Sequence, residues 1–521
     1  MIRKKLLKSP QIWFLLLAIA LGILLRTQNI AGKLYWIDET FTLLRVSGYT
    51  TQDVTETVYG QDVVTVEELQ KYQGTSPKDP GIQGTLLGLA LEEPQHPPLY
   101  FALSRFWAEI FGSSKTALRS LGVLGSLLGF PALYWLCREL FPAQPLISLW
   151  TMALYAVSPV AIRYAQAARQ YSLWFSLTVL SNALLLRALR KDSVWSWVGY
   201  GFAIASSLYC HFLAGLMLIA QGLFVVLLEH FRPTRRFFYF IGAAVGAVLL
   251  FLPWVMVALL NPEKVAETTS HLEDSLSWLN MVQLWIVGLT KTLFAAHFRF
   301  TFQLVLIGIP LSLCVFYSLY HLWRYGPRPT KLLLFCWLGT FFLPFLALDL
   351  IVGGQRTVQD RYFLPCYAVI YIVLAYGIVT AQQSPRSLQH KLGQSIGAIA
   401  LTLGIVSSVI AIPAPTWWGL SEFDVEIAQI INAAPNPVLV TDGYFFWILR
   451  LAQDLNPQTQ LAFRPESTPL ETTPAQQQIF YYNPSPKLQQ TLVSQGQQPE
   501  PVYEFRDDST GFTVTLYRVS S

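Results

Sequence analysis

Long apolar segments alternate with short polar connections over most of this chain. The apolar segments recur between residues 117 and 413, and another covers about residues 12–25. Residues 146–162 form one of these segments, and residues 194–229 divide into 194–211 and 212–229 or at another point. A helix needs about 20 mainly apolar residues to cross the hydrocarbon core of a bilayer, so the pattern predicts about eleven membrane spans. The expected fold class is mainly α, a polytopic helical bundle in a membrane.

Positive charges in the connections set the expected orientation. The basic start, Arg3 to Lys5, precedes the first apolar segment, and no small-residue cleavage site follows that segment. We therefore expect a retained first helix with its basic end in the cytoplasm. An odd number of spans then places the C-terminal tail on the opposite, outer side. Four later loops carry the Lys/Arg excess typical of the cytoplasmic side: Arg187, Arg190 and Lys191; Arg232, Arg235 and Arg236; Arg324, Arg328 and Lys331; Arg386 and Lys391.

Two regions outside the apolar pattern are expected on the outer side. The first outer loop covers residues 27–115, where residues 66–72 favour a short helix and residues 99–111 favour a helix on the membrane interface. The tail, residues 416–521, reads as a small soluble α/β domain attached to a membrane module of residues 1–415. Its expected elements are strands at residues 437–441, 478–482 and 512–517 and a helix at residues 444–453.

Composition supports the membrane class and excludes others. The 521 residues are 53% hydrophobic and 13% charged, whereas soluble domains carry about 25% charged residues. A formal charge of +5 is too small to indicate a nucleic-acid partner. The five cysteines lie in or beside apolar segments without CxxC spacing, so they are expected to be buried apolar side chains. The chain also lacks the sequence motifs of nucleotide-driven transport and zinc proteolysis.

An acidic pair, Asp38 and Glu39, follows shortly after the first apolar segment. Carboxylates at a membrane face are costly unless they stay in water or line a polar cavity. Asp38 is therefore a candidate general base, with Glu39 as a neighbour that shapes the local field or holds a cation. The structural alternative is a helix start, with Asp38 as the N-cap and Glu39 in the first turn.

A second motif, His96-Pro97-Pro98-Leu99-Tyr100, comes directly before the chain returns to the apolar phase. The two prolines fix an extended entry and remove two backbone donors. His96 could bind phosphate, bind a metal or shuttle protons, or it could be an ordinary loop histidine. The acidic pair and this motif fall on the same expected side, so we interpret them as halves of one outward-facing active site.

Several arginines lie on the expected outer side, against the usual charge bias. Arg163 and Arg169 occupy one outer loop, Arg356 and Arg361 occupy another, and Lys291 is a weaker addition. Guanidinium groups match phosphate oxygens in a bidentate manner, so an anionic ligand at the outer face explains them. Snorkelling to outer lipid headgroups is the alternative. Further cations and histidines weighed for this region are His297, Arg299 and His211, the last as a satisfied core histidine.

Four pieces in order resemble the GT-C membrane glycosyltransferases. They are the acidic pair, the His-Pro-Pro-Leu motif, the block from Ser158 to Ser172 (SPVAIRYAQAARQYS) and the block from Arg361 to Pro365 (RYFLP). The likeness covers about residues 10–380 and is greatest to protein O-mannosyltransferases, the lipid A aminoarabinose transferase and bacterial dolichyl-phosphate-mannose-protein mannosyltransferase-like proteins. Tyr164 and Tyr362 lie within these blocks and join His96 and Tyr100 as further candidate site residues.

The resemblance implies a polyprenyl-phosphate-sugar donor and transfer at the outer face of a membrane, here expected to be a bacterial plasma membrane. It also implies that Asp38 is the base, with Glu39 as its partner. The chain departs from the protein mannosyltransferases at Leu99-Tyr100, where they have Gly-Lys, and it lacks their folded lumenal insert. The acceptor is left open between lipid, glycan and protein.

The expected chemistry is an inverting displacement. Asp38 would take the acceptor proton, and the arginines with Lys291 would stabilise the departing phosphate. The sequence identifies no definite cofactor; a divalent metal ion at Asp38, Glu39 or His96 is an open alternative, although these positions form no recognised metal spacing. Two rival functions are a lipid-linked glycan flippase and a membrane anchor for the tail. A flippase would more often carry ionisable residues deep within spans or two similar halves.

Overall fold

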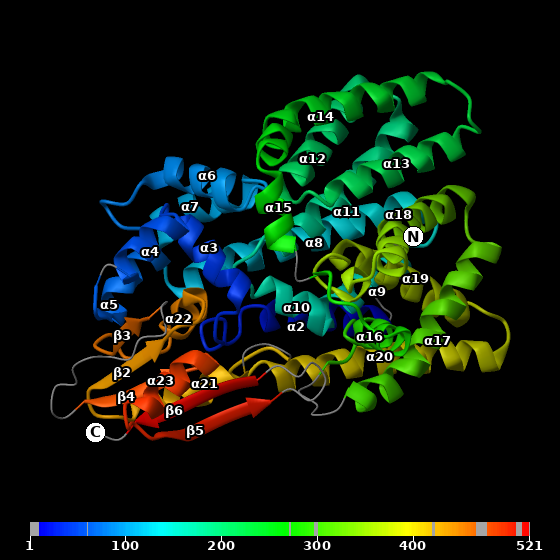
Figure 1. Ribbon diagram of the computed structural model, residues 1–521. Helices are drawn as coiled ribbons and strands as arrows, with labels where there is room; N and C mark the ends of the chain where they lie inside the picture. The colour runs from blue at the N-terminus through cyan, green and yellow to red at the C-terminus, as the bar shows by residue number, and fades with distance from the viewer. Residues whose placement is uncertain are drawn as a thin grey trace. The chain divides into compact units, whose positions relative to one another are not determined.

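The computed structural model describes residues 10–59, 61–269, 272–295, 301–418, 422–464, 477–506 and 513–519. The chain divides into two compact units (Figure 1). The helical unit contains residues 1–30, 89–100 and 119–413, and the mixed unit contains residues 31–88, 101–118 and 414–521. Each unit is described by itself below.

Long apolar helices dominate the helical unit, as the hydropathy pattern predicts. Within the described ranges, seven helices are long and apolar enough to cross a membrane, or eight if one bent pair counts as a single span. In the most apolar 18-residue stretch of α19, 83% is buried inside the protein, whereas the corresponding figure for α14 is only 17%. Helix α14 therefore presents most of its apolar surface outward. The seven are α8 (Lys115–Leu140), α11 (Tyr171–Lys191), α14 (Arg235–Leu260), α17 (Thr301–Tyr325), α18 (Arg328–Ile351), α19 (Leu364–Gln382) and α20 (Ser387–Ala411).

Shorter elements complete this unit. The apolar stretch over residues 194–229 divides at His211 into two helices, which agrees with the expected segments 194–211 and 212–229. In the described part of the chain, length and composition identify seven or eight candidate spans, so the count of about eleven stays a prediction. His297 and Arg299 lie outside the described residues. The shorter elements are α2 (Pro10–Leu25), α12 (Val194–Cys210), α13 (Ala214–Leu228), α15 (Pro262–Thr269), α16 (Trp278–Thr290) and the 3-10 turn η3 (Arg356–Val358).

One predicted apolar segment is bent in the structure. Residues 146–162 were expected to form one span, but α9 (Pro145–Val157) and α10 (Pro159–Ala165) meet at 65°. Ser158 lies between them, and Pro159 opens the second helix. Proline has no N–H to donate to the carbonyl four residues earlier, and its ring clashes with that carbonyl, so a straight helix cannot continue here.

A six-stranded sheet forms the framework of the mixed unit, with strand order β1-β3-β2-β4-β6-β5. The central strands β3, β2 and β4 are parallel, and the outer strands pair antiparallel. The predicted strands at residues 437–441 and 478–482 agree with β2 and β4. The strands are β1 (Val64–Thr65), β2 (Pro437–Thr441), β3 (Gln460–Phe463), β4 (Gln478–Tyr482), β5 (Pro499–Arg506) and β6 (Thr513–Val519).

Helices cover both faces of this sheet because successive strand residues point to opposite faces. Leu439, Leu461 and Phe480 pack into a core with α3, α4, α5, α21 and α22, whereas Val438 and Ile479 pack with α23 on the other face. The bounds are α3 (Ile37–Ser47), α4 (Thr51–Tyr59), α5 (Val66–Leu69), η1 (Gln70–Gln73), α21 (Glu422–Asn432), α22 (Phe445–Leu451) and α23 (Pro486–Ser494). Two further helices, α6 (Gly81–Glu92) and α7 (Leu99–Phe111), flank the His96 motif.

The first outer loop and the tail contribute to the same sheet and the same hydrophobic core. Strand β1 of the loop pairs with β3 of the tail, placing Val64 opposite Leu461. Val54 and Tyr72 of the loop are buried in the same core as Leu439. The mixed unit is therefore larger than residues 416–521. The functional division into a membrane module and a separate tail domain stays a prediction.

A buried ion pair in the mixed unit gives a pH-dependent expectation. The Asp424 and Arg450 side chains are 2% and 3% exposed, and their Oδ2 and Nη2 atoms are 2.5 Å apart. Burial raises the pKa of Asp424 from 3.8 to about 6, although Arg450 opposes the shift. Because the folded-state pKa is raised, this carboxyl contributes stability that is fully present below pH 4 and is lost as the pH rises through 6.

Replacing Asp424 with Asn removes this titration. We expect the free energy of unfolding of Asp424→Asn, relative to wild type, to rise by about 2–3 kcal/mol between pH 4 and pH 7. Thermal melting of the full chain in detergent at these pH values measures the difference. Glu426→Gln on the same helix is the matched control, because Glu426 is exposed. Parallel melting curves for Asp424→Asn and wild type would contradict the assignment.

Candidate functional site

The acidic pair lies in the first turn of α3, in the mixed unit. Trp36 is the N-cap, with φ −93° and ψ 164°, and its N–H donates to Oε2 of Glu39 at 3.2 Å. The prediction that Asp38 is the N-cap is therefore wrong. Glu39, at the third helical position, reaches back to Trp36, so the helix begins at Ile37 and Asp38 takes the second position.

The two carboxylates occupy different positions in the first turn of α3. Glu39 is 2% exposed and completes the helix cap, whereas Asp38 is 9% exposed. The positive end of the helix dipole favours the ionised form of a carboxylate at this position, and that form can accept a proton. Helix α3 packs on α22, where the ring centroids of Phe41 and Phe446 lie 4.2 Å apart.

His96 lies in the loop between α6 and α7, in the part of the chain that belongs to the helical unit. The indole Nε1 of Trp254 donates to the Pro94 carbonyl at 3.1 Å and so holds this loop to α14. The Nε2 atom of His96 lies 3.1 Å from Nη2 of Arg169, and its Nδ1 atom lies 3.3 Å from the side-chain amide of Gln170. Residues far apart in sequence thus meet at one imidazole.

Nitrogen groups of Arg169 and Gln170 face the two ring nitrogens of His96. A guanidinium group only donates, so Nε2 of His96 accepts from Arg169. The atom of Gln170 that faces Nδ1 of His96 is its amide nitrogen Nε2. Both ring nitrogens are then engaged, and His96 supports Arg169. Within the described ranges, no three His, Cys, Asp or Glu side chains gather where they could hold a metal ion.

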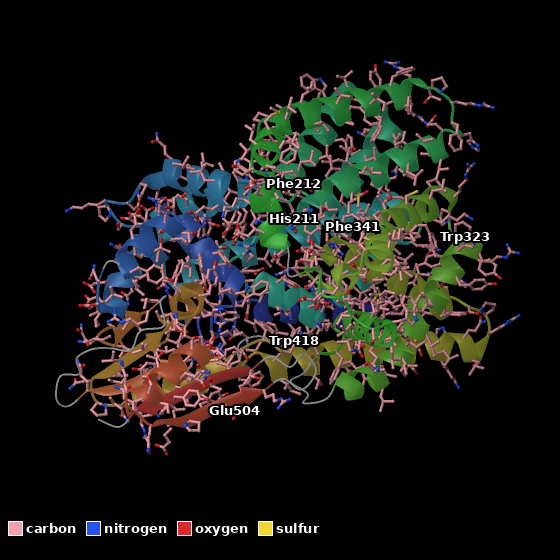
Figure 2. The ribbon with its side chains drawn as sticks, in the orientation of Figure 1. His211, Phe212, Trp323, Phe341, Trp418 and Glu504 are labelled. Carbon is pink, nitrogen blue, oxygen red and sulfur yellow. The ribbon has the colours of Figure 1, made fainter. Side chains whose placement is uncertain are left out.

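Arg169 and Arg361, which the sequence places in separate loops, both influence the pKa of one buried histidine, His211. His211 lies in the turn between α12 and α13, and burial, together with the charges of Arg169 and Arg361, lowers the pKa of His211 to about 3. The centroid of its ring lies 4.1 Å from that of Trp174, and the Phe341 ring lies 6.3 Å from the same indole. Figure 2 labels His211 and Phe341. We call Arg169, Arg361, His96, Gln170 and His211 the arginine cluster.

The remaining arginine of the first block lies on α10. Arg163 is 9% exposed, and its guanidinium lies 5.4 Å from the ring centroid of Tyr164. Arg361 has the same relation to Tyr362, also at 5.4 Å. Tyr100 is fully buried on α7. The two predicted tyrosine neighbours thus lie beside the arginines with which the sequence blocks pair them.

The other two predicted phosphate ligands are held by carboxylates. The Nζ atom of Lys291 lies 2.6 Å from Oδ2 of Asp360. Nη1 of Arg356 lies 3.2 Å from Oδ1 of Asp349 and donates to the Gly353 carbonyl at 2.7 Å. Each of these cations is therefore partly neutralised by a carboxylate, which weakens its attraction for a phosphate.

Sequence reasoning did not single out three of the residues that matter here. Gln170 lies inside the quoted SPVAIRYAQAARQYS block but has no charge to draw attention to it. Asp360 directly precedes Arg361, and only the fold shows that it pairs with Lys291. Arg26 could have been found, because it lies at the expected outer end of the first span, where a cation runs against the charge bias.

Comparisons with known proteins agree with this fold. Residues 95–257 match the family described as dolichyl-phosphate-mannose-protein mannosyltransferase. The chain is 24% identical over 310 residues to the undecaprenyl phosphate-alpha-4-amino-4-deoxy-L-arabinose arabinosyl transferase 2 of Proteus mirabilis (strain HI4320). That match spans 58% of this chain and about half of the relative, 52% of its length.

Two solved structures of ArnT from Cupriavidus metallidurans are similar over 98% of both chains, with TM-scores of 0.56. One is in the apo state and is 13% identical to this chain; the other is bound to undecaprenyl phosphate and is 14% identical. These structures and the family match confirm the resemblance stated from the four sequence blocks. The chain has the GT-C fold of membrane glycosyltransferases and is similar to their mannosyl- and aminoarabinosyl-transferring members.

Proposed function

We propose that this protein is an inverting glycosyltransferase that moves a sugar from a polyprenyl-phosphate donor to an acceptor at the outer face of a membrane. The observation that carries the proposal is that the buried Arg169 lies 3.1 Å from His96 of the His-Pro-Pro-Leu motif, while its charge and that of Arg361 both lower the pKa of His211. Guanidinium groups are suited to bidentate contact with phosphate oxygens. Because the pKa of His211 is lowered to about 3, this ring is uncharged at neutral pH and adds no charge to those of the two guanidinium groups.

The donor class follows from the surroundings of the cluster. A polyprenyl chain is a long apolar tail, which dissolves in the bilayer around an apolar helical bundle. Its phosphate would remain at the polar surface, where an arginine cluster can bind it. The similar proteins support the same class, since one carries undecaprenyl phosphate in its name and another is bound to that lipid.

The reaction in this proposal is a single displacement. An acceptor hydroxyl or amine attacks the anomeric carbon, the bond from that carbon to the phosphate oxygen breaks, and configuration inverts. The polyprenyl phosphate leaves with the bonding electron pair. Asp38 takes the acceptor proton, and Arg163, Arg169 and Arg361 stabilise the charge on the leaving phosphate. Lys291 and Arg356 would contribute less, because Asp360 and Asp349 partly neutralise their charges.

Orientation and acceptor belong to the same proposal. We place the N-terminus in the cytoplasm and the tail outside, in a bacterial plasma membrane, because the basic loops follow the positive-inside pattern. Membrane lipids surround the bundle. The acceptor is a lipid, a glycan or a protein, and product analysis must identify it.

The test uses the full chain in liposomes with labelled polyprenyl-phosphate sugars. The proposal requires release of polyprenyl phosphate together with a glycosylated product of inverted configuration. Movement of the intact lipid-linked sugar across the bilayer without release would contradict it and support the flippase. Adding a chelator to the same assay decides whether a divalent cation takes part.

A further inference from the structure

The bend between α9 and α10 leaves backbone groups without their usual helical partners. Pro159 has no N–H to donate to the Tyr155 carbonyl. The Val160 N–H donates instead to the Lys291 carbonyl at 3.2 Å. The Val157 carbonyl accepts from the Ser408 hydroxyl at 3.1 Å. Buried carbonyls need such partners, so the bend depends on donors from other elements.

Arg26 supplies donors to the other carbonyls of the bend. Its Nη2 donates to the Tyr155 carbonyl at 2.9 Å, and its Nη1 donates to the Ala156 carbonyl at 2.7 Å. Nη1 also donates to the Gly22 carbonyl at 2.7 Å, and Nε donates to the Ser126 hydroxyl at 2.9 Å. The side chain is fully buried. A planar fork with fixed donor directions suits this set of acceptors, which the single nitrogen of lysine cannot reproduce.

Close helix packing brings Arg26 to the bend. A Cβ atom added at Gly22 would lie 2.2 Å from the Ala156 carbonyl oxygen, so only glycine permits this approach of α2 to α9. The guanidinium carbon also lies 4.8 Å from the ring centroid of Tyr155, which adds a cation–π contact. The charge is therefore held by oriented carbonyl dipoles and an aromatic face.

The same stretch of chain holds the other end of α10. Gln166, the C-cap of α10, donates through Nε2 to the carbonyls of Leu25 and Arg26 at 3.2 Å and of Gln28 at 2.8 Å. Arg26 and its neighbours thus contact α10 at its start, through the bend, and at its end. Between these contacts lies Arg163, and the turn that leaves Gln166 leads directly to Arg169.

We propose that Arg26 is a positioning residue that fixes α10 and residues 166–170, so that Arg163 and Arg169 are presented in a set geometry to the donor phosphate. The phosphate part of this inference rests on the proposed function. The mechanical part, that Arg26 holds α10 in place, stands independently of any ligand.

Hydrogen–deuterium exchange of the full chain tests the mechanical part. In Arg26→Met, peptides covering residues 158–170 should exchange faster than in wild type, while peptides from α18 should exchange at the wild-type rate. Ser126→Ala is the matched control, because it removes one bond of Arg26 and leaves both bonds to the bend. Gln166→Met detaches the other end of α10 and gives the same test if Arg26→Met does not fold. Wild-type exchange of residues 158–170 in a folded Arg26→Met or Gln166→Met overturns the inference.

Binding and kinetics test the phosphate part, with undecaprenyl phosphate as the probe. Arg26→Met should weaken its binding and lower kcat/KM on the order of tenfold to a hundredfold, as expected when site residues shift slightly. Relative to Arg26→Met, the variant Arg26→Lys should recover more of the thermal stability than of the affinity for undecaprenyl phosphate. This difference distinguishes a positioning role of Arg26 from a general effect on stability. Faster exchange with wild-type affinity would overturn the phosphate part. If wild type binds no undecaprenyl phosphate, the proposed function fails, while faster exchange would still support Arg26 as the residue that holds α10.

Discussion

Asp38→Asn is expected to lower the rate of sugar transfer by about two to four orders of magnitude while leaving the affinity for polyprenyl phosphate unchanged. Asn has nearly the same shape as Asp but cannot accept the acceptor proton. It also sits well at the start of a helix, so the fold of α3 should persist. Single-turnover release of labelled polyprenyl phosphate measures the chemical step, and equilibrium binding of undecaprenyl phosphate measures the donor site separately.

Glu39 provides the matched control for this experiment. Glu39→Gln keeps an oxygen that can accept the Trp36 N–H, and Gln is as suitable as Glu in a capping box. The variant therefore removes a charge without removing the cap. We expect Glu39→Gln to lose much less activity than Asp38→Asn. Wild-type activity in Asp38→Asn would contradict the assignment, and a loss confined to Glu39→Gln would make Glu39 the base.

Arg169→Ala is expected to weaken binding of undecaprenyl phosphate by about a hundredfold. The side chain is 2% exposed, and its Nη2 donates to His96 while its charge acts on His211. Removing it deletes a fork suited to phosphate and leaves His96 without this donor. Arg169→Lys keeps the charge but loses the fork, so its affinity should lie between those of wild type and Arg169→Ala.

Arg190→Ala is the control for charge alone. Arg190 lies in the last turn of α11, is 54% exposed and pairs with Glu139 at 2.5 Å. Its loss removes one positive charge from the same helical unit without touching the arginine cluster. If Arg190→Ala weakens binding as much as Arg169→Ala, the effect reflects overall charge. The arginine cluster would then not be the phosphate site.

The membrane helices could be predicted from the sequence because their signal is local. An apolar run of sufficient length forms a helix in a membrane, whatever its neighbours are. The bend at Pro159 was missed because the run of apolar residues continues through it, and only the proline marks the break. The N-cap of α3 was also misplaced. Asp38 has the preferred N-cap side chain, but the bond from Glu39 to Trp36 starts the helix earlier.

The candidate site was only partly predictable because it depends on pairing between distant residues. The charge pattern drew attention to Arg169 and Arg361, whose charges both lower the pKa of the same histidine. The same pattern also singled out Arg356 and, with less weight, Lys291, and the fold supplies a carboxylate partner to each. The number of charges in a loop does not show whether a cation pairs with a carboxylate, as Lys291 does, or contacts an imidazole, as Arg169 does.

The pairing of β1 with β3 has a consequence for biosynthesis. Thr65 pairs with Gln460, and a ribosome adding about 5–20 residues per second needs roughly 20–80 seconds to pass from one to the other. During that interval Val54, Val58 and Tyr72 lack the strands that later bury them. The newly made loop must wait, with its apolar side chains uncovered, until the last part of the chain emerges. The helix that bears Asp38 packs on α22 in this late-forming core, so the proposed catalytic base is among the last features of the molecule to mature.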